Sequence, residues 1–180
     1  MPGAHAWAKG SPGGLSTTTP GYETEPGAEE QTESETTPTG PPDSALLLGT
    51  GRAAAPLDAP PRVRQVIAAA NRIRTKPYIW GGGHGRWWDR GYDCSGSVSF
   101  ALHGGGFLSS PLTSGSLESW GKPGKGRWIT IYANAGHVFA VIAGLRWDTV
   151  GDTSGTGPRW HPEMVSSRGY VARHPAGYGS

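Results

Sequence analysis

The clearest hydrophobic pattern in the chain recurs every three or four residues, as expected for one face of an amphipathic helix. The apolar positions of this pattern are Val63, Val66, Ile67, Ala70 and Ile73. Prolines precede the run and Pro77 follows it, which is typical of the two ends of a helix. The pattern therefore predicts a helix of about four turns.

A second, shorter helix is predicted to begin at Cys94. Its apolar side chains are Val98, Phe100, Ala101 and Leu102, and the run "HGGG" at 103–106 ends it. Between the two predicted helices lies a glycine-rich stretch, 78–92, which is crowded with tryptophan and predicts an irregular loop. We expect Trp80 in this loop, and Trp128 further on, to be core residues.

The second half of the chain changes to β-branched and aromatic segments separated by turn residues, which is typical of strands. The predicted strands are 127–132, 137–144, 145–150 and 169–174. The short link "AGLR" predicts a hairpin between the middle two. Helices followed by an antiparallel sheet indicate an α+β domain of about 120 residues.

The first third of the chain has a different composition. From about residue 10 to 51 it is rich in Thr, Pro, Glu, Ser and Gly, and such a segment buries too little apolar surface to offset the entropy of ordering. We therefore predict a disordered acidic linker over 1–57, including the apolar run "ALLLG" at 45–49, and a folded domain over 58–180.

Charge separates the same two parts. Residues 1–58 hold two basic and eight acidic side chains, whereas residues 59–180 hold fourteen basic and six acidic ones. A basic domain can bind an anionic partner, such as nucleic acid or a bacterial envelope. The charge is equally consistent with a solvated basic surface that has no partner. No nucleic-acid-binding motif is present, so we expect no nucleic-acid partner.

Cys94 is the only cysteine, so no internal disulfide can form. At a helix N-terminus the unpaired N–H groups and the helix dipole stabilise a thiolate, the nucleophilic form. A buried structural cysteine is the alternative. Metal binding by Cys94 with His84, His103 or His137 lacks paired-ligand spacing, and we expect neither a metal nor a cofactor.

A nucleophilic cysteine needs a base that is near in space. His137 opens the predicted strand 137–144, and the two-residue period groups it with Phe139 and Val141 in a row that we expect to face the helix of Cys94. Across the hairpin, Asp148 returns toward His137 and can orient its ring. Asp152 and His161 on the following segment are alternatives for this third residue.

Three stretches together resemble the NlpC-type family, papain-like bacterial cysteine peptidases of the cell wall. They are "PYIWGGGH" (77–84), "YDCSGSVSFAL" (92–102) and "GHVFAVIAG" (136–144). The resemblance extends over about half of the chain and implies a papain-like fold, with N-terminal helices packed on a small antiparallel sheet. It also implies a cysteine peptidase, a hydrolase that cleaves amide bonds in peptidoglycan stem peptides, for example between D-glutamate and a diamino acid.

The resemblance assigns roles to individual residues. Cys94 becomes the nucleophile, His137 the general base and Asp148 the third residue, where family members usually have a histidine or another polar residue. It implies that Tyr78 lies near the oxyanion site, and that Asp93 and Ser95 bind substrate, with Asp93 placed to receive a free substrate amine. Segment 108–116 resembles the family's loop after the second helix.

The sequence also departs from the family. The region before His137 lacks the aspartate that family members commonly carry, and neither the loop with Trp87 and Trp88 nor the tail after Glu163 has a clear counterpart. The alternatives are therefore a catalytically weak wall-binding module on the same fold, and an amidase or acyl hydrolase with another substrate.

The expected partner is peptidoglycan or a muropeptide, bound by a monomer without a membrane span, because the apolar runs are shorter than about 20 residues. A wall substrate predicts a secreted or cell-wall-associated protein, although no signal peptide is visible in "MPGAHAWAKGSPGG".

Overall fold

The computed structural model describes residues 42–151 and 157–180. The disorder predicted for 1–41 and the candidate Asp152 lie outside these residues. The elements, in chain order, are β1 (Leu46–Leu47), β2 (Ala53–Ala54), α1 (Pro61–Ile73), α2 (Cys94–Gly104), α3 (Ser114–Leu117), β3 (Lys122–Pro123), β4 (Ile129–Ala133), β5 (Val138–Ile142), β6 (Leu145–Asp148), β7 (Arg159–His161) and β8 (Val171–His174).

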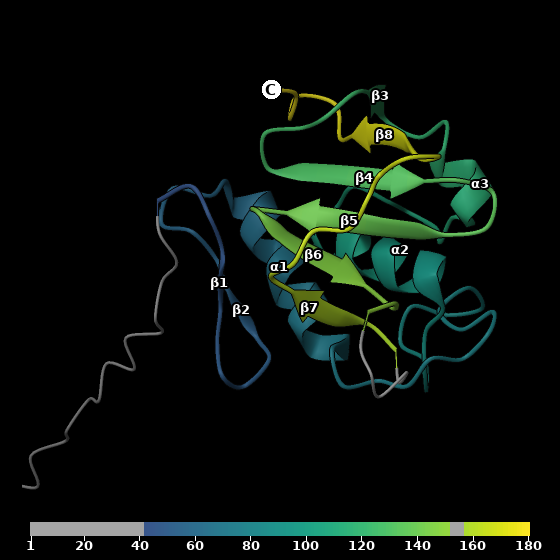
Figure 1. Ribbon diagram of the computed structural model, residues 1–180. Helices are drawn as coiled ribbons and strands as arrows, with labels where there is room; N and C mark the ends of the chain where they lie inside the picture. Colours follow the sequence, from purple (N-terminus) through teal and green to yellow (C-terminus); the bar gives the residue numbers. More distant parts are fainter. Residues whose placement is uncertain (1–41, 152–156) are drawn as a thin grey trace, which may run out of the picture. The chain divides into compact units, whose positions relative to one another are not determined.

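The larger sheet has the strand order β3-β8-β4-β5-β6-β7, and every neighbouring pair in it is antiparallel. The predicted α+β class with an antiparallel sheet is thus confirmed (Figure 1). The predicted hairpin is also present, since Ile142 pairs with Leu145 across a two-residue turn. Ala143 and Gly144 in that turn have φ angles of 46° and 82°, the left-handed region that tight hairpins require.

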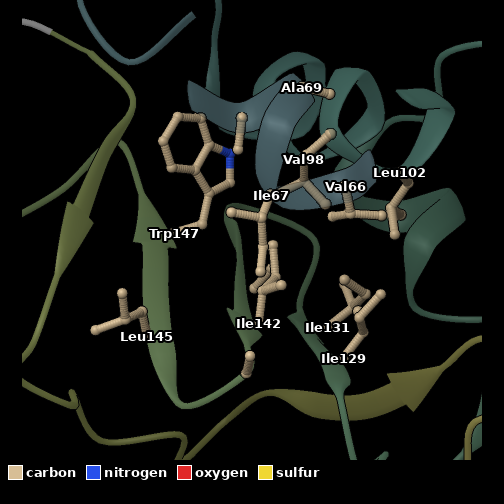
Figure 2. Packing of buried hydrophobic residues seen from close by; sticks show 14 of the residues in the cluster. Val66, Ile67, Ala69, Val98, Leu102, Ile129, Ile131, Ile142, Leu145 and Trp147 are labelled. Atoms are coloured by element: carbon tan, nitrogen blue, oxygen red, sulfur yellow. The ribbon is translucent and has the colours of Figure 1, made fainter. Parts of the chain in front are cut away.

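Both predicted helices form, and they pack against the same face of the sheet (Figure 1). Pro61 occupies the first position of α1, where its missing N–H costs nothing. The five apolar positions that predicted α1 are all buried. Figure 2 shows Ile67 of α1 and Val98 of α2 facing Ile131 and Ile142 of the sheet.

Beyond the predicted boundary, the folded part begins before residue 57. Strands β1 and β2 form a small hairpin, and the side chain of Asn71 in α1 makes two hydrogen bonds with the backbone of Ala53. Ala53 N–H donates to Asn71 Oδ1 at 2.9 Å, and Asn71 Nδ2 donates to the Ala53 carbonyl at 2.8 Å. Trp160 of β7 donates its indole N–H to the same Oδ1 at 3.0 Å. The prediction of a linker over 45–57 is therefore wrong, because this stretch contains alanines that are buried and a backbone that is held by a buried amide.

The face of β5 that meets the helices differs from the sequence prediction. Val138, Ala140 and Ile142 belong to the core shared with the helices, so Phe139 and Val141 lie on the opposite face, whereas His137 precedes β5 and lines a cleft with Cys94 of α2. Phe139 is nevertheless buried, because Tyr132 stacks on it and Tyr170 meets it edge-on. The segment between β7 and β8 crosses this face of the sheet, as Figure 1 shows. The two-residue period correctly placed Phe139 and Val141 on one face of β5. It could not show which face meets the helices, because both faces of this strand are covered.

Candidate active site

Cys94 is the first residue of α2, as predicted, and its side chain is partly exposed. The helix is capped by Asp93, whose Oδ1 accepts a hydrogen bond from Gly96 N–H at 2.7 Å. No residue other than glycine fits at position 96, because a Cβ there would lie 2.0 Å from the Gly82 carbonyl oxygen. This close approach presses the glycine-rich loop 78–84 against the first turn of α2, beside Cys94.

A cleft of about 420 Å³ opens at this point. Its lining residues are Tyr78, Trp80, Gly81, His84, Asp93, Cys94, Ser95, Thr113, Ser114, Ala135, Gly136 and His137. Three parts of the chain therefore meet in the cleft: the glycine-rich loop with the start of α2, the start of α3, and the turn before β5. Of the six site residues predicted from the sequence, five line this cleft and Asp148 does not; the five are Tyr78, Asp93, Cys94, Ser95 and His137.

His137 lies one residue before β5 and connects two of the predicted site residues. Its Nε2 is 2.9 Å from Asp148 Oδ1, and its ring lines the same cleft as Cys94, near enough for the sulfur to raise its pKa. The Asn134 side chain fixes this turn, since its Oδ1 accepts the Gly136 and His137 backbone N–H groups at 2.9 and 2.8 Å.

The environment favours a protonated His137. Burial alone lowers its pKa, but the hydrogen bonds and negative charges of Asp148 and Cys94 outweigh burial and raise the pKa to about 9. An imidazolium at neutral pH stabilises a neighbouring thiolate. Tyr170 borders the ring on another side, with its centroid 6.4 Å away in an edge-on arrangement.

Asp148 lies at the end of β6 and is 3% exposed. Its Oδ1 accepts from His137 and from Val150 N–H, and its Oδ2 accepts from Arg146 Nη1. Burial raises the pKa of Asp148, but these donors and the charge of His137 reverse the effect and leave the pKa below its usual value. Asp148 is thus held as a carboxylate whose oxygens point at His137 and at Arg146.

The buried Arg146 was not identified from the sequence. Its side chain is 3% exposed and also donates to two backbone carbonyls, Glu163 at 3.0 Å and Val150 at 2.9 Å. Of the alternatives for the third residue, Asp152 lies outside the described residues. His161 lies on β7 opposite Arg146 in the register, and the carboxylate bonded to His137 is that of Asp148.

His84, which lines the same cleft, joins Asp93 and Ser95. The Nε2 atom of His84 lies 3.1 Å from Asp93 Oδ1 and 3.0 Å from Ser95 Oγ. In the sequence analysis His84 was named only as a possible metal ligand, and its contacts with Asp93 and Ser95 were not predicted. Asp93 is 8% exposed and serves as the helix cap, and its Oδ2 accepts from Gly81 N–H at 3.1 Å.

Two aromatic residues of the same loop also reach the cleft. Tyr78 is exposed, at 40%, and its partial burial, followed by the negative charges of Cys94 and Asp93, raises its pKa, so its hydroxyl remains a hydrogen-bond donor. Trp80 is 87% exposed, so the prediction of a core position is wrong, whereas Trp128 is 7% exposed and belongs to the core as predicted. The turn that holds Trp80 directs its indole outward, which residue type alone does not predict.

Comparison with known proteins adds no assignment: no protein-family model matches the chain, and a search of curated proteins finds no significant relative. Within residues 42–151 and 157–180, no helix is long and apolar enough to cross a membrane. The same residues contain no group of three or more His, Cys, Asp or Glu side chains arranged to hold a metal ion.

Proposed function

We propose that this protein is a cysteine peptidase that hydrolyses amide bonds in peptidoglycan stem peptides. The observation that carries the proposal is the position of the His137 ring, which is hydrogen-bonded through Nε2 to Asp148 at 2.9 Å and lines the same cleft as Cys94. A cysteine at a helix start, a base beside it and a buried carboxylate that orients the base are the three parts that nucleophilic acyl transfer requires.

In the proposed mechanism, the Cys94 thiolate attacks the carbonyl carbon of the amide and forms a carbon–sulfur bond. The negative charge that develops on the carbonyl oxygen is met by backbone N–H groups at the start of α2 and by the Tyr78 hydroxyl. The carbon–nitrogen bond then breaks, and the departing amine takes the proton of His137. Water hydrolyses the thioester, with its proton returning to His137, which yields a free carboxylic acid and restores Cys94.

The choice of substrate is supported by the resemblance to the NlpC-type family and by the basic charge of the folded part, which suits an anionic cell wall. On this proposal the protein acts outside the cytoplasmic membrane, secreted or associated with the wall. A papain-like arrangement of the helices and sheet is part of the same proposal.

The test uses purified peptidoglycan and soluble muropeptides, with products identified by mass spectrometry. Wild-type protein is expected to release peptide fragments with one new carboxyl and one new amino group, and Cys94→Ala is expected to release none. Binding of Cys94→Ala to wall material should persist. Cleavage by Cys94→Ala would remove Cys94 from the role of nucleophile, and wall binding by wild type without any cleavage would favour the binding-module alternative.

A further inference from the structure

A second hollow, of about 340 Å³, lies where the ends of α1 and α2 meet the glycine-rich loop. It shares no lining residue with the cleft of Cys94. The 11 residues of α2 run from Cys94 in the cleft to Gly104 in this hollow, so the two lie about 15 Å apart along the helix. The side chains that give the hollow its chemistry are Arg72 of α1, Phe100 and His103 of α2, and Trp87 and Trp88 of the loop.

Two cations stand beside this hollow without a protein anion. The Arg72 guanidinium carbon is 5.2 Å and the Lys76 ammonium nitrogen 4.6 Å from the centroid of the Trp88 ring. In the described part of the chain, neither side chain pairs with a carboxylate or donates to a protein oxygen, whereas Arg62 and Arg74 of the same helix and its cap both donate to backbone carbonyls. The two like charges repel each other, and an anion bound near both would replace that repulsion with attraction.

The two tryptophans are held in place by the loop itself. Tyr92 is fully buried, and its hydroxyl donates to the Trp87 carbonyl at 2.7 Å and accepts from Asp89 N–H at 3.0 Å. The Trp87 ring stacks on His103 with the ring centroids 3.8 Å apart. Trp88 is nevertheless 51% exposed. A fixed aromatic surface of this kind loses little entropy when a ligand covers it.

His103 adds a hydrogen-bonding group that is open to a ligand. Its Nδ1 lies 2.8 Å from the Leu108 carbonyl, and a carbonyl only accepts, so Nδ1 carries a proton. Its Nε2 has no hydrogen-bond partner in the described part of the chain. An imidazole nitrogen accepts when neutral and donates when protonated, and a hydroxyl group can meet either need.

We propose that this hollow binds an anionic sugar, a ring that carries hydroxyls and a carboxylate or phosphate group. Arg72 and Lys76 bind the anion, His103 bonds a hydroxyl, and the exposed part of Trp88 contacts the C–H groups of the ring. A nucleic acid combines similar groups, but its bases stack on open ring faces, whereas His103 covers one face of Trp87 and two cations approach Trp88.

The site is separate from the chemistry at Cys94, and it would hold the protein on a polymer of the cell envelope while the cleft stays free. The choice of an envelope polymer as the source of the sugar rests on the proposed function. The polymer is one of sugar acids or one of sugars joined by phosphate, and the test distinguishes these two sources.

The test measures binding to wild-type protein by isothermal titration calorimetry. The probes are a uronic acid tetrasaccharide, the same tetrasaccharide with its carboxyls reduced to alcohols, a phosphate-linked hexose tetramer, and a short single-stranded DNA. We expect the uronic acid or the phosphate-linked probe to bind about tenfold more tightly than the reduced one, as charge-assisted hydrogen bonds allow. The tighter of the two identifies the source. The Trp88 indole N–H signal in NMR spectra should shift on titration, and that of Trp80 should not.

Variants assign the binding to the hollow. Arg72→Gln should lower the affinity for the anionic sugar about tenfold, and Lys76→Gln about threefold, because a lysine binds without a paired fork of donors. Trp88→Ala should lower it about fivefold. Arg86→Gln is the matched control for charge, because Arg86 is an exposed cation of the same loop that lies 3.8 Å from Asp89 and does not line the hollow. Trp80→Ala is the control for an exposed tryptophan outside the hollow.

Equal affinity for the anionic and the reduced sugars would overturn the proposal, and so would an equal loss in Arg86→Gln and Arg72→Gln. Tighter binding of the DNA, lost in Arg72→Gln, would make the hollow a nucleic-acid contact instead. Cleavage of muropeptides is scored separately. If the sugar binds as expected but no muropeptide is cleaved, the peptidase function fails and the sugar site stands. If muropeptides are cleaved but no anionic sugar binds, the peptidase function stands and this proposal fails.

Discussion

Two histidine–aspartate pairs flank Cys94, and they differ in what stands behind them. His137 bonds to Asp148 at 2.9 Å, and Asp148 is in turn bonded to the buried Arg146. His84 bonds to Asp93 at 3.1 Å, and Asp93 is shared with the backbone of the helix it caps. Only for the first histidine does Cys94 contribute to a raised pKa. On the proposed function, a short histidine–carboxylate distance is thus not enough to mark a catalytic base, and proximity to Cys94 is the distinguishing feature.

The largest expected difference between the pairs is in turnover. On the proposed function, His137→Ala removes the proton carrier, and we expect kcat on muropeptides to fall by about a thousandfold or more. His84→Ala should leave kcat within about tenfold of wild type. Steady-state kinetics on one muropeptide checks both variants. Equal losses of kcat would end the distinction between the two histidines.

The next difference is in stability. Asp148→Ala leaves the buried Arg146 charge without its partner, and we expect the free energy of unfolding to fall by about 3–5 kcal/mol. Asp93→Ala removes a helix cap and should cost only about 1–2 kcal/mol. Urea titrations followed by circular dichroism measure both. The double variant Arg146→Met/Asp148→Leu is the control, and it should recover most of the stability without recovering turnover.

A smaller effect is expected from pH. The pKa of His137 is raised from 6.5 to about 9 in the folded protein. The stabilisation from its protonated form is therefore complete below about pH 6.5 and is lost as pH rises through about 9, by roughly 3 kcal/mol. Urea titrations across this range should show the decline in wild type and in His84→Ala. A decline of the same size in His137→Gln would assign it to another group.

The smallest effect concerns the turn that presents His137. Asn134→Ala removes two acceptor contacts to backbone N–H groups, and we expect about 1 kcal/mol of lost stability and a severalfold lower kcat. Asn134→Asp keeps the acceptor oxygens and is the matched control. Thermal melting and steady-state kinetics check both variants, and an unchanged kcat in Asn134→Ala would show that the strand alone positions His137.

The sequence predicted the parts of the fold that repeat a local pattern. Helix α1 followed from its apolar spacing, and the pairing of β5 with β6 followed from a short turn rich in small residues. Because that hairpin fixes which residues lie opposite one another, the approach of Asp148 to His137 was also predictable. Short elements such as α3 and β7 have too few residues to show a period.

The missed features depend on contacts between distant segments. Arg146 in a strand resembles a solvent-facing residue until the segment before β8 covers it, and no local pattern predicts that crossing. His84 reaches Asp93 only because Gly82 and Gly96 let the loop touch α2. Trp80 is exposed for a reason of the same kind, since the turn geometry overrides the usual tendency of tryptophan to be buried.

Asn71 has a practical consequence for anyone who produces or trims this protein. Its amide holds the backbone of β2 and the indole of Trp160 at once, so the first hairpin and β7 share one anchor. A protease that cut between Arg52 and Leu57 would put at risk two of the three hydrogen bonds of this buried amide and would loosen a strand more than a hundred residues away. The smallest fragment worth expressing therefore starts ahead of Ala45, and limited proteolysis should leave the hairpin attached.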